Sequence, residues 1–216
     1  MLLAQSLSAV EGSNNITLSD EIKKDDSTEE VCRKLLNTNI TVLSQTLDKI
    51  NYSDIDKAVT MMEEARLIHL FGVGSSCVMA LEAKNRLSVI LPNIVFSEDC
   101  HMQNMASALL EEQDLAIAFS YSGSSKDTIA ILKQAKQNHA KTICITRFAE
   151  SPLTAYADIV LPFGANEGPF QGGSLSVRIA QIYLLDILYT EYFKRNYSKC
   201  DVNKIRTAES VAPRLL

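Results

Sequence analysis

Two short segments rich in serine and glycine carry the residue types that bind phosphate. Residues 120–125 read Ser-Tyr-Ser-Gly-Ser-Ser and follow the apolar run 116–119, and a helical pattern begins directly after them at Lys126. Backbone N–H groups and hydroxyls at the start of a helix point into one crevice, where the positive end of the helix dipole also attracts an anion. Residues 120–125 therefore predict a phosphate-binding loop.

A second segment of the same kind lies earlier in the chain. The apolar run 67–71 leads into residues 72–76, Gly-Val-Gly-Ser-Ser, and a helical pattern begins near Cys77. Two strand–loop–helix units of this kind fit neighbouring strands of one open parallel sheet, whose carboxyl ends share a ligand crevice. Together the two loops predict a site for a small phosphorylated ligand.

From Leu67 onward short apolar runs alternate with helical patterns, which is typical of a parallel sheet covered on both faces. The predicted strands are residues 67–72, 94–97, 114–120, 141–146 and 158–163. The predicted helices are residues 75–90, 100–111, 125–139 and 173–195, with a short turn at 151–156. Ahead of the sheet, Ser27 or Thr28 can cap a first helix, and a second is expected over residues 54–65. The predicted fold class is α/β, a three-layer αβα sandwich with a five-stranded parallel sheet, flavodoxin-like or Rossmann-like, plus N-terminal helices.

The chain is expected to divide into three segments. Residues 1–26 are assigned to an N-terminal arm or linker, because residues 11–27 are polar and carry glycine and asparagine. Residues 27–200 are assigned to the compact domain and residues 201–216 to a C-terminal tail. The helix predicted over residues 173–195 has almost no polar face, so we predict a homodimer contact there. The alternative is a central core helix of a monomer.

The bulk composition excludes several classes of protein. A formal net charge of −5 with dispersed Lys and Arg predicts a poor DNA binder. No apolar run approaches the roughly 20 residues that span a bilayer, so no membrane partner is expected. Five scattered cysteines fit reduced thiols and a cytoplasmic location. No cofactor is expected.

The three histidines are far apart in sequence and predict no metal site. We interpret His69, inside a predicted strand, as structural, and His139, at the end of a predicted helix, as complementing the helix dipole. His101 opens the helix after the second strand, near the carboxyl edge of the sheet. It is therefore a candidate for a contact with the ligand or across a dimer.

The stretch from Ile68 to Tyr192 resembles the sugar isomerase domain, or SIS domain. Residues 120–127 match the family signature Ser-x-Ser-Gly-x-Ser/Thr-x-Glu/Asp, and residues 72–76 match its first phosphosugar loop. Further segments resemble the effector-binding half of RpiR-type transcriptional regulators: residues 27–30, 39–40, 46–47, 99–103 and 178–181. The resemblance implies that DNA is bound only through a helix-turn-helix domain missing from this chain, with residues 1–10 as a candidate remnant.

The resemblance also implies a sugar-phosphate effector and a set of residues that bind it. These are Gly74, Ser75, Ser76, Ser120, Ser122, Gly123, Ser124, Ser125, Thr128, Glu167 and Ser174. Hydroxyls and amides of the second loop should hold the phosphate, while Ser75 and Ser76 reach the sugar or the phosphate. Asp127 either complements the dipole of its helix or contacts the ligand, and Ser174 either caps the last helix or contacts the ligand.

We expect a phosphosugar-sensing domain, a homodimer or a tetramer, that controls the DNA-binding activity of a regulator of carbohydrate-metabolism genes. The alternative is an aldose–ketose isomerase with Glu167 as general base. The thin set of acid and base groups favours the regulator, and we assign no catalytic residue. A dinucleotide site with Glu98 on a ribose is a further alternative, although Cys77 stands where the third glycine would be needed.

Overall fold

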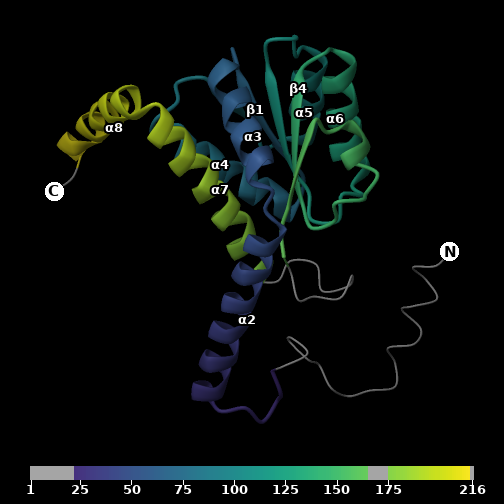
Figure 1. Cartoon of the computed structure of the whole chain (residues 1–216), viewed down its shortest axis with the longest axis vertical. Helices are drawn as coiled ribbons and strands as arrows, with labels where there is room; N and C mark the ends of the chain where they lie inside the picture. The colour runs from purple at the N-terminus through teal and green to yellow at the C-terminus, as the bar shows by residue number, and fades with distance from the viewer. Residues whose placement is uncertain (1–21, 165–174, 215–216) are drawn as a thin grey trace. The chain divides into compact units, whose positions relative to one another are not determined.

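A computed structural model describes residues 22–164 and 175–214 of the chain (Figure 1). The chain divides into two compact units, Met1–Thr41 and Val42–Leu216, and the boundary lies within helix α2 (Thr28–Lys49). Most of the predicted arm, residues 1–26, lies outside the described residues.

In the first unit, reciprocal hydrogen bonds fix the start of α2. The Ser27 N–H donates to Glu30 Oε2 at 2.7 Å, and the Glu30 N–H donates to Ser27 Oγ at 3.3 Å. This pair is a capping box, which satisfies two N–H groups that the helix leaves unpaired. Ser27, rather than Thr28, is therefore the cap.

The second unit contains the predicted five-stranded parallel sheet. Its strands are β1 (Ile68–Gly72), β2 (Ile94–Phe96), β3 (Leu115–Phe119), β4 (Lys141–Thr146) and β5 (Ile159–Pro162). All neighbouring strands are parallel, in the order β2-β1-β3-β4-β5. The order changes direction between β1 and β3, which makes this pair the topological switch point where open α/β sheets bind their ligands.

Helices cover both faces of the sheet, as predicted for the three-layer sandwich (Figure 1). The further helices are α3 (Tyr52–Glu64), α4 (Ser75–Leu87), α5 (Cys100–Ala108), α6 (Lys126–Gln137), α7 (Leu175–Arg195) and α8 (Tyr197–Val211). α3, α4 and α7 pack together on one face, and α5 packs with α6 on the other. No described helix is long and apolar enough to cross a membrane.

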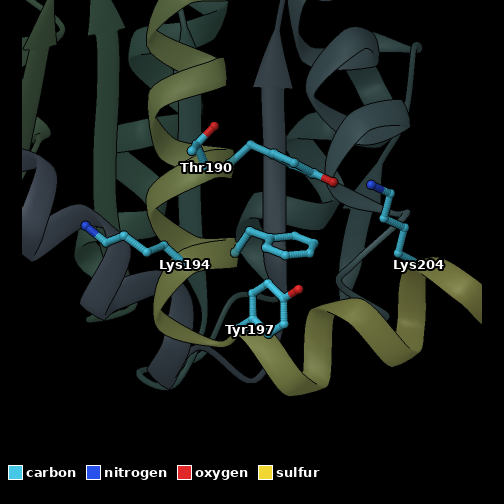
Figure 2. Close-up of a pocket in the computed structure, with 6 residues that line it drawn as sticks. Thr190, Lys194, Tyr197 and Lys204 are labelled. Atoms are coloured by element: carbon cyan, nitrogen blue, oxygen red, sulfur yellow. The ribbon is translucent and has the colours of Figure 1, made fainter.

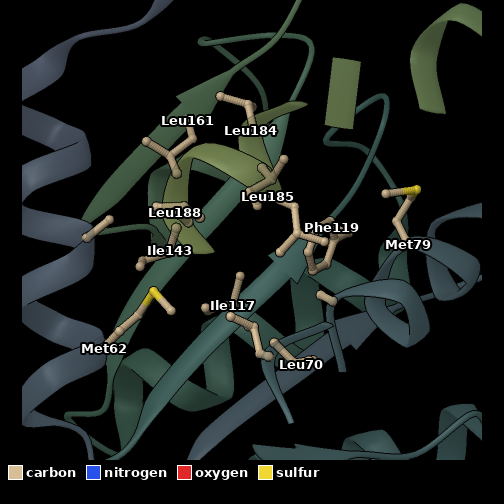
Figure 3. Close-up of a cluster of buried hydrophobic side chains, with 14 of the residues drawn as sticks. Met62, Leu70, Met79, Ile117, Phe119, Ile143, Leu161, Leu184, Leu185 and Leu188 are labelled. Carbon is tan, nitrogen blue, oxygen red and sulfur yellow. The ribbon is translucent and has the colours of Figure 1, made fainter. Parts of the chain in front are cut away.

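Alternating residues of the buried strands supply two separate cores. On β3, Ile117 and Phe119 face the core beneath α3, α4 and α7, whereas Ala116 and Ala118 face the core beneath α5 and α6. Figure 3 shows the larger core, with Leu70, Ile117, Phe119, Ile143 and Leu161 from the sheet region, Met62 and Met79 from α3 and α4, and Leu184, Leu185 and Leu188 from α7. Strands buried on both faces read as continuous apolar runs, which is why the sequence reveals them.

Helix α7 packs into the core of its own chain. Ala180, Leu184 and Leu188 are buried there, whereas Thr190 and Lys194 are exposed. This is the core packing that the sequence left open as the alternative to a dimer contact. The homodimer itself stays a prediction.

Residues 201–211, which the sequence assigns to a tail, form most of helix α8. The Asn203 side chain donates to the carbonyl of Ile90 at 2.9 Å, and the Thr207 hydroxyl donates to the carbonyl of Val89 at 3.3 Å. Cys200, in the same helix, is buried in the larger core. The compact unit therefore continues past residue 200.

Candidate functional site

The two predicted loops begin side by side at the switch point. Gly72 ends β1 and is in parallel register with Phe119, which ends β3. The loops that follow lead directly into α4 and α6. The structure thus brings together the predicted residues of segments 74–76 and 120–128 at the carboxyl ends of two central strands of the sheet.

In the first loop, two glycines allow a tight turn into α4. Gly74 has φ 62° and ψ −128°, a conformation that side chains rarely tolerate. A Cβ on Gly72 would lie 2.5 Å from the Ser76 carbonyl oxygen, so the first turn of α4 packs directly on the end of β1. Ser75 is exposed at the start of α4, while Ser76 is buried.

The second loop turns at Gly123, which also has φ 62°. A Cβ there would lie 2.1 Å from Ser151 Oγ, and the Gly123 carbonyl accepts a hydrogen bond from the Leu153 N–H at 3.0 Å. The segment after β4 therefore holds the turn in place. Ser122 and Ser124 are exposed at its surface.

The N-terminus of α6 lacks a side-chain cap. Ser125 occupies the N-cap position but makes no capping hydrogen bond, and Gly74 at the same position of α4 has no side chain to make one. By contrast, Asn51 caps α3 and Asp99 caps α5 with side-chain oxygens. Uncapped N–H groups beside exposed hydroxyls are suited to an anion, because they add hydrogen bonds to the positive end of the dipole.

Gln103 of α5 is a buried residue at this end of the sheet that sequence reasoning did not assign to the site. Its Nε2 donates to the carbonyls of Gly72 and Ser97, both at 2.9 Å, and its Oε1 accepts from the Gly72 N–H at 3.1 Å. The side chain is 1% exposed. Gln103 belongs to segment 99–103, which carries part of the family resemblance. Its partners Gly72 and Ser97 lie 31 and 6 positions away in sequence, so no local pattern indicates its role.

A cation also lies against the second loop. Arg147, just after β4, donates from Nη1 to Tyr121 Oη at 2.6 Å, and its guanidinium carbon lies 5.7 Å from the Tyr121 ring centroid and 5.0 Å from that of Phe148. Arg147 was not predicted as part of the site, because it follows a strand other than the two that lead into the loops.

Two thiols lie at the same end of the sheet. Burial raises the pKa of Cys77 and of Cys100, so both thiols stay neutral.

The remaining candidates from the sequence either lie outside the described residues or are exposed in the first turn of a helix. Glu167 and Ser174 lie outside the described residues. Asp127 is exposed in the first turn of α6, and His101 is exposed in the first turn of α5. Whether either contacts a ligand stays a prediction.

The other two histidines lie away from the loops. His69 is buried in β1, where its ring stacks on Phe71 at 5.9 Å. His139 has φ 64° just after α6, so it is the left-handed residue that ends the helix. Among the described side chains, no group of three or more His, Cys, Asp or Glu residues could hold a metal ion.

A separate groove of about 380 Å³ lies along α7 and α8 (Figure 2). It is lined by Tyr189, Thr190, Phe193, Lys194, Tyr197 and Lys204. None of the predicted ligand-binding residues that the structure describes lines it. The loops, rather than this groove, carry the predicted phosphate chemistry.

Comparison with known proteins identifies the family. The sequence model of the SIS domain matches residues 61–191. The chain belongs to the SIS domain family. This membership confirms the resemblance drawn from the two loops.

The relatives of this SIS domain include transcriptional regulators. An HTH-type transcriptional regulator from Haemophilus influenzae is 37% identical over 187 residues, which are 87% of this chain and 65% of the relative. The chain thus spans just under two thirds of that relative's length.

Solved SIS structures share the fold. NanR from Vibrio vulnificus, solved with ManNAc-6P, has a TM-score of 0.83 at 24% identity, covering 99% of this chain and 74% of NanR. The sugar isomerase domain of an RpiR transcription factor from Sphaerobacter thermophilus has a TM-score of 0.75 at 24% identity, covering 84% of this chain and 99% of the other.

Proposed function

We propose that this chain is the phosphosugar-sensing effector domain of an RpiR-type transcriptional regulator. The observation that carries the proposal is the pair of loops at the β1/β3 switch point, each of which opens a helix without a side-chain cap. Sensing a sugar phosphate there would control the DNA-binding activity of a regulator of carbohydrate-metabolism genes. The DNA contact would come from a helix-turn-helix domain, as the names of the relatives indicate.

The ligand class is a sugar phosphate or an amino-sugar phosphate. NanR was solved with ManNAc-6P, and its fold covers nearly the whole of this chain, which supports an amino-sugar phosphate among the candidates. In this proposal Ser120, Ser122 and Ser125 hold the phosphate together with the amides near Gly123 and Ser124. Ser75 and Ser76 reach the ligand from the neighbouring strand.

Glu167 and Ser174 complete the proposed ligand contacts from the segment between β5 and α7. As a ligand-binding group, the Glu167 carboxylate would accept hydrogen bonds from sugar hydroxyls. As a general base it would instead remove a proton from a sugar carbon, which is the isomerase alternative. We propose the first role, because the relatives are named as regulators.

A sensor needs two states that the ligand binds with different affinity. We propose that these are two geometries of a cytoplasmic homodimer. The half-buried apolar side chains of α7, among them Ile182 and Ile187, are suited to such a contact.

The test is a thermal-shift screen against hexose, pentose and amino-sugar phosphates, followed by an assay for chemical conversion of each hit. A ligand at 100 times its dissociation constant stabilises the native state by about 2.7 kcal/mol, which is easily visible. A hit recovered unchanged supports the sensor, and a converted hit makes the protein an enzyme. If no compound shifts the melting temperature, the phosphate loops are wrongly assigned.

A matched pair of serine variants locates the binding. Ser122 of the second loop and Ser198 of α8 are both exposed. Ser122→Ala removes a hydroxyl from the proposed phosphate site, so it should reduce the thermal shift produced by a hit. Ser198→Ala should leave that shift unchanged.

A further inference from the structure

Gln103 occupies the position that a further residue of β2 would take in the sheet. The register pairs Leu70 of β1 with Phe96, the last residue of β2, so β1 extends beyond its neighbour. On that side no described strand lies beside Gly72. The Gln103 amide fills the gap, since it accepts from the Gly72 N–H at 3.1 Å and donates to the Gly72 carbonyl at 2.9 Å.

The same amide also fixes the loop that follows β2. Its second Nε2 hydrogen bond reaches the Ser97 carbonyl, at 2.9 Å. One buried side chain of α5 therefore joins the segment that leads to the first serine loop with the segment that leads to His101. Every polar atom of this amide has a partner, which is what a buried polar group requires.

We propose that Gln103 is the positioning residue of the sugar-phosphate site, an inference that rests on the proposed function. It does not touch the ligand. It holds Gly72, and through it Gly74 and Ser75, in the conformation that receives the ligand. Loss of the amide leaves two carbonyls and one N–H without partners, and the loop then adopts other conformations that supply them.

The expected consequence of losing the amide is weaker binding. Apparent affinity falls in proportion to the fraction of molecules whose first loop has the conformation that receives the ligand, here called the competent conformation. If only a tenth of the molecules keep the loop in place, the apparent dissociation constant rises about tenfold. The rate of dissociation from the competent state should change less than the rate of association.

The first experiment compares two buried positions of α5 by calorimetry, with N-acetylmannosamine 6-phosphate and inorganic phosphate as probes. Gln103→Leu removes all three hydrogen bonds and should weaken binding about tenfold or more. Ser107→Ala is the matched control, because the buried Ser107 hydroxyl donates only within its own helix, to the Asn104 carbonyl at 2.8 Å. The control should stay within about twofold of the wild-type chain.

The second experiment uses pH within a single variant, so that a folding defect does not obscure the result. In Gln103→Glu the ionised carboxylate can accept a hydrogen bond from the Gly72 N–H, but it has no proton to donate to the carbonyls of Gly72 and Ser97. The protonated carboxyl group regains one O–H donor for one of these carbonyls. Burial raises the pKa of a carboxyl group, so protonation should begin well above the ordinary range.

The dissociation constants of Gln103→Glu and of the wild-type chain are measured between about pH 8 and pH 5.5, and their ratio is compared. The phosphate of the ligand itself titrates in this range, with a second pKa of about 6, and the ratio cancels that effect because it is the same for both chains. The ratio should be about tenfold or more at the higher pH and should fall as the carboxyl is protonated. Circular dichroism at each pH checks that the chain is folded.

Three outcomes are distinguishable. Weak binding by Gln103→Leu, together with recovery of Gln103→Glu at low pH, supports the inference. Wild-type binding that both variants retain at every pH overturns the inference and leaves the proposed function intact. A wild-type chain that binds neither probe nor any sugar phosphate of the screen overturns the proposed function and this inference with it.

Discussion

The two ends of the sheet treat polar groups in opposite ways. At the amino-terminal end, Arg66 donates to both carboxylate oxygens of Asp114, at 3.0 and 2.9 Å, and Lys136 pairs with Asp158. At the carboxyl-terminal end, hydroxyls and helix N–H groups stand beside glycine turns, and neither α4 nor α6 has a side-chain cap. At the amino-terminal end the charged groups stabilise the fold, whereas at the carboxyl-terminal end the exposed hydroxyls and uncapped helix starts form the site that we propose for the ligand.

The pKa values at the amino-terminal end follow from this pairing. Burial alone would raise the pKa of Asp114, but hydrogen bonds from Arg66 and from the Glu111 N–H hold it below its ordinary value. Asp158 behaves in the same way, with Lys136 and Thr142 as its donors. These carboxylates stabilise the fold only while they are ionised.

The largest expected effect on stability comes from the amino-terminal end. Asp114→Ala should lower the free energy of unfolding by about 2–3 kcal/mol, because it leaves the Glu111 N–H and the Arg66 guanidinium without their shared partner. Urea denaturation measures the change, with the exposed Asp48→Ala as control. Ligand affinity should stay the same for both. If Asp114→Ala bound the ligand more weakly under conditions in which it is fully folded, the assignment of stability and binding to opposite ends of the sheet would be contradicted.

The next effect concerns the carboxyl-terminal end. Gly123→Ala should weaken sugar-phosphate binding about tenfold and destabilise the fold by about 1–2 kcal/mol, because alanine tolerates φ 62° poorly and its Cβ would meet Ser151. Adding Ser151→Gly removes the steric part and should restore some of the stability. Calorimetric titration and urea denaturation measure the two quantities. Unchanged binding in Gly123→Ala would show that the turn does not shape the site.

The smallest effect is a pH dependence of stability that originates in β1. Burial lowers the pKa of His69, an effect to which the charge of Arg66 adds and which Asp114 opposes. The unfolded chain therefore takes up a proton near pH 6.5 that the native state resists, so stability falls as the pH drops below about 6.5.

His69→Gln removes this term and should make the dependence of unfolding free energy on pH shallower, by at most about 1.4 kcal/mol per pH unit. His101→Gln, at an exposed position, is the matched control. Identical slopes for the wild-type chain and His69→Gln would assign the acid sensitivity to other groups. The carboxylates at the same end lose their contribution only at lower pH, as they are protonated through their depressed pKa values.

The sheet and the serine loops could be predicted because their signals are local. The run Ile143 to Ile145 of β4 is buried on both faces and reads as a continuous apolar segment. In the segment from Ser120 to Ser125, the glycine of the turn, the hydroxyls and the start of the next helix follow one another directly in the sequence. The family resemblance rested on the same residues. Their meeting at one end of the sheet follows from the parallel topology.

The parts that the sequence did not reveal depend on distant partners. The side chains of Asn203 and Thr207 in helix α8 donate hydrogen bonds to the carbonyls of Ile90 and Val89. Contacts made by polar side chains produce no periodic pattern of apolar residues in the sequence. The sequence shows a glutamine at position 103, but the role of this side chain depends on strand β2 ending before strand β1. No periodicity in the sequence specifies where one strand ends relative to another.

A single NMR titration addresses the site most directly. Backbone amide signals of the chain are followed as N-acetylmannosamine 6-phosphate is added, with unphosphorylated N-acetylmannosamine as the control. We expect saturable shifts in segments 74–76 and 122–126 with the phosphorylated sugar alone. Shifts that cluster instead at Lys194 and Lys204 of the groove along α7 and α8, or that are equal for both sugars, would contradict a phosphate site at the two loops.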